Sequence, residues 1–285
     1  MLELSSIPEL RAWTRNYRAA GRRIGLVPTM GFLHEGHLAL VDEARRRVDA
    51  VVLSIFVNPL QFGPQEDLAR YPRDLARDRS LAQGRGVDAI FVPDVSTMYP
   101  AASEVRVIPG PTAERWEGAA RPGHFSGVLT IVAKLFHLVE PDLAVFGQKD
   151  IQQFTLIRRM VQDLDWPVEI TMVRTVREPD GLALSSRNAY LSTADRERAR
   201  VLSRALQAAH RAWHAGETGP SALEAVMRQL LAGEPTVAVE YIAVVDPDRL
   251  APVERADGRT IIATAARVGG TRLIDNIILG EGTGE

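Results

Sequence analysis

Two histidines three residues apart stand in the segment Leu26–His37, LVPTMGFLHEGH. The segment begins as an apolar run typical of a buried parallel strand, which we expect to break at Pro28 and turn at Gly31. After His37 the apolar residues recur at helical spacing. His34 and His37 are therefore expected at the junction between a strand and the N-terminus of the following helix. Backbone N–H groups and the helix dipole favour phosphate there, and two imidazoles add hydrogen-bond donors.

Paired histidines also have simpler interpretations. Two histidines near a turn can be surface residues or helix caps, and they can bind zinc. The chain has no cysteine, and no third ligand is obvious near the pair, which disfavours zinc. A strand, a proline, a glycine and His-x-Gly-His in one short run favour the phosphate site.

A second group of polar residues follows the apolar run Ala50–Val57, which is typical of a strand covered on both faces. The polar, proline-rich loop after it is expected at the carboxyl end of the sheet, where ligands bind in open α/β folds. Asn58 and Gln61 offer neutral amides that suit the hydroxyl and carboxylate groups of a small substrate. Taken alone, without the neighbouring motifs, Gln61 is better interpreted as a solvated loop amide.

A strand expected over Asp142–Phe146 delivers the turn Gly147–Asp150 to the same edge. Lys149 in this turn is well placed for a phosphate, although a solvated lysine at a helix start is an alternative. Gln153, one helical turn later, is expected to face the same edge of the sheet as Lys149.

Two further segments carry hydrogen-bond donors. The loop Asp180–Arg187 holds two serines and a guanidinium, which could close over a polyphosphate. Arg121 and His124 precede an apolar helix, so His124 is either a helix-start residue or, with Arg121, an anion contact.

The remaining elements follow from periodicity and from helix and turn signals. A Ser6 capping box begins a helix that ends near Gly21. Further helices are expected at 74–83, 127–139, 150–161, 194–215 and 221–231, and further strands at 89–92, 105–108, 168–173, 237–245, 260–267 and 272–279. From Thr193 onward strands and helices no longer alternate, which indicates a domain boundary near Val176 to Ser192. The sequence thus predicts an α/β fold: a Rossmann-like parallel-sheet, nucleotide-binding domain (1–176) followed by a smaller α+β lid domain (177–285).

Composition excludes several classes of protein. The 285 residues are 46% hydrophobic with a net charge of −2, and the pI is about 6.3, which argues against nucleic acid as an obligatory partner. Without cysteine there are no disulfides and no thiol catalysis. No basic, apolar leader and no apolar run of about 20 residues is present, so we expect a soluble cytoplasmic protein without a membrane segment.

With these motifs placed, the chain resembles the pantothenate synthetases, a branch of the nucleotidylyltransferase superfamily whose core is related to class I aminoacyl-tRNA synthetases. The resemblance covers nearly the whole length, and it rests on VPTMGFLHEGH, SIFVNPLQFGPQEDLARYPRD, RPGHFSGV, FGQKDIQQ and DGLALSSRN in the family's order. Ala39 and Ser126 depart from residues frequent in the family.

The resemblance implies a two-step ligase. The carboxylate of pantoate attacks the α-phosphate of ATP, and the amine of β-alanine then attacks the pantoyl adenylate, giving pantothenate, AMP and pyrophosphate. It implies catalytic roles for His34, His37, Lys149 and Arg187, with His37 matching the residue usually named as proton donor. It implies substrate contacts for Gln61 and Gln153, to which Asn58 is added. The implied ATP contacts are Met30, Gly31, Phe32, Leu33, His34, Glu35, Gly36, His37, Gly147, Gln148, Lys149, Asp150, Val176, Leu184, Ser185, Ser186 and Arg187.

The resemblance also implies Mg²⁺ bridging the phosphates, with no protein ligand singled out, a homodimer, and a place in coenzyme A synthesis. Charge that accumulates on the phosphoryl oxygens needs fixed donors, so we interpret His37 chiefly as a charge-stabilising donor. Three alternatives are a nucleotidylyltransferase with a phosphorylated acceptor, a nucleic-acid module and a nucleotide sensor without turnover. The first would want a basic acceptor pocket instead of neutral amides.

Overall fold

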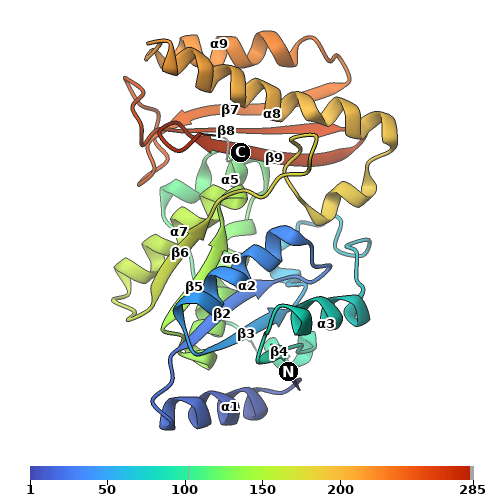
Figure 1. Ribbon diagram of the computed structural model, residues 1–285, viewed down its shortest axis with the longest axis vertical. Coiled ribbons are helices and arrows are strands. Elements are labelled where there is room, and N and C mark those ends of the chain that lie inside the picture. Colours follow the sequence, from blue (N-terminus) through green and yellow to red (C-terminus); the bar gives the residue numbers. More distant parts are fainter. Residues whose placement is uncertain (102, 283–285) are drawn as a thin grey trace. The chain divides into compact units, whose positions relative to one another are not determined.

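The computed structural model describes residues 1–101 and 103–282. The chain forms two compact units, each with its own sheet (Figure 1). The first consists of Met1–Ala113, Arg121–Gly147 and Leu156–Val173, and the second of Glu114–Ala120, Gln148–Thr155 and Arg174–Glu285. The predicted domain boundary at residue 176 stays a prediction, and residues 283–285 of that predicted second domain lie outside the described residues.

A six-stranded parallel sheet forms the first unit, with the strand order β1-β4-β3-β2-β5-β6 (Figure 1). Its strands are β1 (Leu2–Leu4), β2 (Ile24–Thr29), β3 (Ala50–Ile55), β4 (Ala89–Phe91), β5 (Leu143–Gly147) and β6 (Glu169–Val173). The order reverses beside β2, which lies between β3 and β5, so the carboxyl ends of β2 and β5 flank the switch point where such sheets bind ligands.

Helices cover both faces of this sheet. They are α1 (Ile7–Ala19), α2 (Glu35–Arg47), α3 (Leu75–Gly84), α4 (Val95–Met98), α6 (His124–Val139) and α7 (Ile151–Asp163), whose first turn belongs to the second unit. Val145 packs in the cluster that includes α2, whereas its neighbour Phe146 packs against Phe136 of α6. Because successive strand residues face opposite sides, α2 and α6 lie on opposite faces.

The first helix starts as predicted. The Ser6 hydroxyl accepts from the Glu9 amide, and the Glu9 carboxylate accepts from the amides of Ser5 and Ser6, at 2.9 Å each. These bonds lower the pKa of Glu9 to about 2. The predicted capping box is therefore confirmed.

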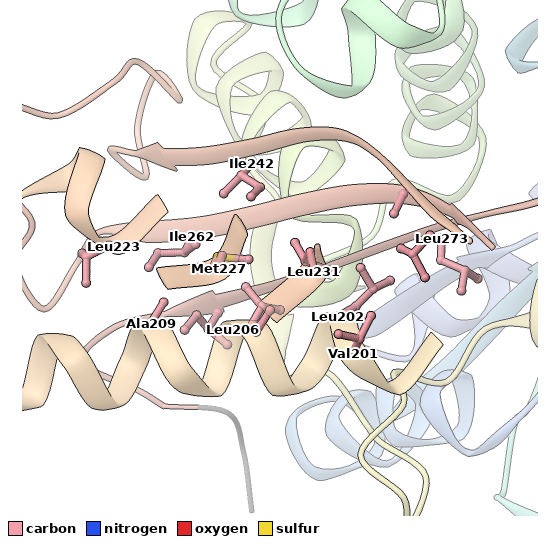
Figure 2. Close-up of a cluster of buried hydrophobic side chains, with 14 of the residues drawn as sticks. Val201, Leu202, Leu206, Ala209, Leu223, Met227, Leu231, Ile242, Ile262 and Leu273 are labelled. Carbon is pink, nitrogen blue, oxygen red and sulfur yellow. The ribbon is translucent and has the colours of Figure 1, made fainter. Parts of the chain in front are cut away.

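An antiparallel three-stranded sheet, β7-β8-β9, forms the second unit with α8 (Thr193–His214) and α9 (Pro220–Leu231). Its strands are β7 (Val237–Val245), β8 (Ile261–Val268) and β9 (Thr271–Ile278), and the short α5 (Glu117–Ala120) joins it. Apolar side chains fill the space between the two helices and the sheet (Figure 2), among them Leu202, Leu206, Met227, Leu231, Ile262 and Leu273. The predicted fold class, a parallel α/β unit followed by an α+β unit, is confirmed.

The predicted break at Pro28 is wrong, because β2 continues to Thr29. The Thr29 carbonyl accepts from Phe56 on the β3 side, so the missing N–H of Pro28 falls on the opposite side. There the pairing with β5 has already ended, since it is recorded only at Gly25 and Leu26. A proline costs no ladder bond at such a place.

The strand predicted at 105–108 is also wrong. The amide of Val107 donates to Thr130 Oγ1 at 2.9 Å, and its carbonyl accepts from Ser126 Oγ at 2.8 Å. Side chains of α6 thus satisfy this backbone instead of a neighbouring strand, and Val105 and Ile108 are more than four-fifths exposed, at 85% and 83%. The prediction missed β1, which is too short for periodicity to indicate.

Within the described residues, no helix combines the length and the apolar composition needed to cross a membrane.

One glycine fixes the distance between α6 and the loop after β3. A Cβ on Gly127 would lie 2.2 Å from the carbonyl oxygen of Leu60 and 2.7 Å from the amide nitrogen of Gln61. The helix and the short 3₁₀ turn η1 (Pro59–Gln61) therefore meet backbone to backbone.

Replacing this glycine tests the contact. We expect Gly127→Ala to lower the free energy of unfolding by about 1–3 kcal/mol, because the backbone of η1 must move away. Urea unfolding measures the change. Gly84→Ala is the control, since nothing lies within 4 Å of its Cβ position; it should be neutral or stabilising by up to about 1 kcal/mol. Equal losses in both variants would contradict the contact.

Candidate functional site

The two histidines lie at the junction between β2 and α2, as predicted. Gly31 and Phe32 have φ values of +80° and +50°, which turn the chain out of the strand. A Cβ on Gly31 would lie 2.9 Å from Ile55 Cγ2 and 3.0 Å from Asp78 Oδ2, so only glycine fits there. His34 is the N-cap of α2, and His37 lies in its first turn.

A buried carboxylate holds this turn in place. Asp78, on α3, accepts from the amide of Phe32 at 2.8 Å and from the amide of Leu33 at 2.7 Å. Burial raises the pKa of Asp78 above its usual value, and the two backbone hydrogen bonds oppose the rise. The neighbouring Arg77 donates to the Leu33 carbonyl at 2.8 Å. Side chains of α3 thus satisfy three backbone polar groups of the turn.

The histidine rings are fixed by the start of the helix. His34 Nδ1 accepts from the Gly36 amide at 3.2 Å, and His37 Nδ1 accepts from the His34 amide at 3.3 Å. The ring centroids are 4.0 Å apart. Since an Nδ1 that accepts carries no hydrogen, each neutral ring bears its hydrogen on Nε2.

This geometry refines the predicted anion site. The Gly36 amide, one of the N–H groups expected to meet a phosphate, already donates to the His34 ring. The half-buried rings lie at the positive end of α2, with the hydrogen of each neutral ring on Nε2. Phosphate binding there stays a prediction.

The neutral amides after β3 form a rigid pair. Asn58 is 1% exposed, and its Oδ1 accepts from the Leu60 amide and the Tyr99 hydroxyl. Its Nδ2 donates to the Gly127 carbonyl and to Gln61 Oε1, at 3.0 and 3.1 Å. Asn58 therefore fixes the side-chain amide of Gln61. The Gln61 Oε1 faces Asn58, and the Gln61 Nε2 lies 3.1 Å from Met30 Sδ. Gln61 thus meets the segment that carries the histidines.

An ion pair supports the backbone of the same turn. Arg121 binds Glu66 through two hydrogen bonds, of 2.8 and 2.6 Å, and also contacts His124 Nε2 at 3.0 Å. Burial alone would raise the pKa of Glu66, but the hydrogen bonds and the charge of Arg121 hold that pKa below its usual value. Because arginine only donates, His124 Nε2 accepts, and Nδ1 donates to the Gln61 carbonyl at 2.8 Å. The anion that Arg121 meets is a carboxylate of the chain itself.

In the second unit, Lys149 lies in the 3₁₀ turn η3 (Gln148–Asp150). Its ammonium is 3.5 Å from Asp150 Oδ2, and the lysine side chain as a whole is 21% exposed. Asn276 of β9 donates to the carbonyls of Gln148 and Lys149, at 3.0 Å each. Gln153 is half-buried in the first turn of α7.

The loop before α8 is a small hairpin. The Leu184 amide donates to the Val176 carbonyl at 3.0 Å, and Arg177 binds Asp275 of β9 through two hydrogen bonds, of 2.7 and 3.0 Å. Ser185 caps the turn η4 (Ser186–Tyr190) by accepting from the Arg187 amide at 3.2 Å. The predicted phosphate donors therefore sit on ordered backbone.

The predicted site residues fall in both units. Met30–His37, Asn58, Gln61 and Gly147 belong to the first; Gln148–Asp150, Gln153, Val176 and Leu184–Arg187 belong to the second. Their predicted ligand contacts stay predictions. No group of three or more His, Asp or Glu side chains suited to a metal ion occurs within residues 1–101 and 103–282.

The residues that hold these segments were not predicted from the sequence. Asp78 gives no local signal, because it looks like any polar residue of a helix. Asp275 and Asn276 do give one, since they interrupt the apolar run Leu273–Leu279. The structure buries both, at 3% and 1% exposed.

Asp78 can be tested by removing one acceptor. Asp78→Asn offers a single oxygen and places an NH₂ group against one of the two backbone amides, so we expect a loss of about 1–3 kcal/mol in the free energy of unfolding. Urea titration at neutral pH measures it. Asp163→Asn, on an exposed helix face, should change stability by less than about 0.5 kcal/mol. A similarly small change for Asp78→Asn would show that the turn does not depend on this carboxylate.

The comparisons with known proteins agree with one another. A family model described as pantoate-beta-alanine ligase matches residues 3–278. The pantothenate synthetase of Agrobacterium fabrum is 53% identical over 278 residues, covering 97% of this chain and 95% of that protein. That of Moorella thermoacetica is 53% identical over 272 residues, covering 94% and 96%.

Solved structures show the same likeness. Pantothenate synthetase from Thermus thermophilus superposes with a TM-score of 0.93 at 48% identity, covering 98% of this chain and 99% of that one. Pantoate-beta-alanine ligase from Francisella tularensis, in complex with beta-gamma ATP and beta-alanine, gives a TM-score of 0.83 at 33% identity, covering 99% of each chain. The resemblance seen in the sequence is confirmed: the chain belongs to the pantoate–beta-alanine ligase family of enzymes, the pantothenate synthetases.

Proposed function

We propose that the protein condenses pantoate with β-alanine in two steps, through a pantoyl adenylate, and releases AMP and pyrophosphate. Membership of the family and the ligands named for the Francisella relative support this proposal. The observation that carries the proposal concerns two groups in the first unit. A pair of imidazoles lies at the start of α2, and Met30, in the same segment of the chain, contacts the amide of Gln61 through its Sδ. Phosphate donors and an amide that suits a small acid thus occur together in the first unit.

The proposed chemistry needs charge stabilisation more than proton transfer. A carboxylate oxygen of pantoate bonds to the α-phosphorus while the bond to pyrophosphate breaks. The β-alanine nitrogen then bonds to the acyl carbon, AMP leaves, and the amine loses a proton. In the first step negative charge grows on phosphoryl oxygens, so donors fixed beforehand lower the barrier.

We assign this role to His34 and His37, whose Nε2–H groups are oriented by their bonded Nδ1 atoms. Lys149, Ser185, Ser186 and Arg187 are proposed as phosphate donors from the second unit. The remaining proposed nucleotide contacts are Met30–His37, Gly147–Asp150, Val176 and Leu184.

Gln61 and Gln153 are proposed to hold pantoate, with Asn58 acting on pantoate chiefly by orienting Gln61. A nucleotidylyltransferase for a phosphorylated acceptor would need a cation near these amides. Arg121 contacts the Gln61 carbonyl, but Glu66 binds and neutralises it. This pairing favours an acceptor that carries a carboxylate and hydroxyl groups.

Magnesium is proposed to enter with ATP. Mg²⁺ commonly binds substrate phosphates with one or two carboxylates and several waters, and it needs no dedicated protein cage. When bound it would neutralise charge on the phosphates. Asp150, half-exposed beside Lys149, is a carboxylate of the type it accepts.

The setting of the enzyme is proposed from the family and the sequence together. We propose a cytoplasmic homodimer that acts on small molecules, with neither nucleic acid nor a membrane as partner, and whose product serves coenzyme A synthesis. The domain boundary at residue 176, with the second domain as a lid, belongs to this proposal.

Following both products tests the reaction. With ATP, Mg²⁺ and pantoate, about one equivalent of pyrophosphate per enzyme should be released. Release should then stop, because the adenylate stays bound. Adding β-alanine should restart turnover and release AMP and pantothenate in equal amounts. Release of pyrophosphate only with a phosphorylated acceptor, or no turnover at all, would overturn the proposal.

Two variants of His37 separate its possible roles. His37→Ala should lower kcat by about 10²–10³ with a smaller change in the KM for ATP. His37→Gln keeps a neutral N–H donor, so it should retain clearly more turnover than the alanine variant if His37 stabilises charge. Equal losses in both variants would point to proton donation instead. His137→Ala, an exposed histidine of α6, should behave as wild type.

A further inference from the structure

Two adjacent polar residues, Asp275 and Asn276, lie in the middle of β9. They are 3% and 1% exposed, and apolar residues such as Leu273 and Ile277 surround them in the sequence. Burying a carboxylate and an amide is unfavourable unless each finds partners. The hydrogen-bond partners of Asp275 and Asn276 therefore indicate which segments of the chain these two residues hold in place.

Asn276 uses its side chain entirely on the Lys149 turn. Its Nδ2 donates to the carbonyls of Gln148 and Lys149, at 3.0 Å each, and its Oδ1 accepts from Gln148 Nε2 at 3.2 Å. Two of these bonds hold the backbone on which Lys149 stands, and the third holds the side chain of Gln148. Asn276 is 128 and 127 residues away from Gln148 and Lys149 in the chain, so these bonds tie the turn to a segment distant in sequence.

Asp275 holds the other donor segment. Its two oxygens accept from both terminal nitrogens of Arg177, which in turn donates to the Gly181 carbonyl at 3.1 Å. Asp275 Oδ1 also accepts from the Asn276 amide at 2.8 Å, which ties the two residues together. β9 accordingly packs against both η3 and η4, the turns that carry Lys149 and Arg187.

We propose that Asn276 is a positioning residue for ATP, and that with Asp275 it makes β9 the common support of the phosphate donors in the second unit. The inference rests on the proposed function, because it takes Lys149 as a phosphate donor. Catalysis by fixed donors depends on their placement, and a shift of about 1 Å can cost about 100-fold in rate. A residue that touches no substrate can thus control the use of ATP.

The test compares Asn276→Ala with Leu231→Ala. Leu231 is 2% exposed in the apolar core of the same unit (Figure 2), so its truncation destabilises the unit without touching η3. We expect Asn276→Ala to lower kcat/KM for ATP at least 10-fold while the KM for pantoate changes less than 2-fold. Leu231→Ala should lose comparable stability in urea yet keep both constants within 2-fold of wild type.

A double variant shows whether Asn276 acts through the lysine. If it does, Lys149→Ala with Asn276→Ala should be no more than about 2-fold worse than Lys149→Ala alone. Should the alanine variant not fold, Asn276→Ser, which keeps one donor, serves in its place and should give an intermediate loss.

The outcomes distinguish the two proposals. If Lys149→Ala leaves the kinetics of ATP unchanged, the proposed role of Lys149 fails. If Lys149→Ala is impaired but the Asn276 variant stays within 2-fold, or if Leu231→Ala is impaired equally, the positioning role of Asn276 is overturned. Independent, multiplicative losses in the double variant would also overturn it.

Discussion

Backbone polar groups of buried turns must find hydrogen-bond partners, and this constraint shapes every segment proposed to meet a ligand. The turns after β2, β3 and β5 leave the sheet and lose its ladder, so side chains from elsewhere in the chain replace the missing bonds. Asp78 does so for Phe32 and Leu33, His124 for Gln61, and Asn276 for Gln148 and Lys149. Each anchor fixes a turn to an element that is itself packed in a core.

The charges follow the same logic. Arg121 and Arg177 each form a two-bonded pair with a buried or half-buried carboxylate and also bind a backbone carbonyl. Such pairs owe their strength to bidentate, charge-assisted hydrogen bonds, which offset the cost of desolvating both charges, and they act as structural clamps. An arginine beside a candidate site is therefore not always an anion receptor. Only its partners distinguish the two cases.

Local patterns predicted much of this fold, and long-range contacts account for what they missed. Apolar runs located β2, β3 and β5, and the spacing of the histidines placed them at the start of α2. The strand expected at Val105–Ile108 does not form, because a strand also needs a neighbouring strand and this segment meets a helix. Asp78 could not be singled out, since its importance comes from amides 45 and 46 residues away. The polar pair in β9 was visible in the sequence, but its partners were not.

The ladder between β2 and β3 runs through six residue pairs and ends at Thr29 and Ile55. The histidine turn and the Asn58–Gln61 turn begin within a few residues of that last pair, on strands about 4.8 Å apart. Peptide geometry, which no substitution of a side chain alters, thus sets the spacing of the two turns at their base. Substitutions in the two loops can therefore change the side chains of the proposed phosphate donors and of the proposed acid-binding amides, while the sheet keeps the spacing between the bases of the two turns.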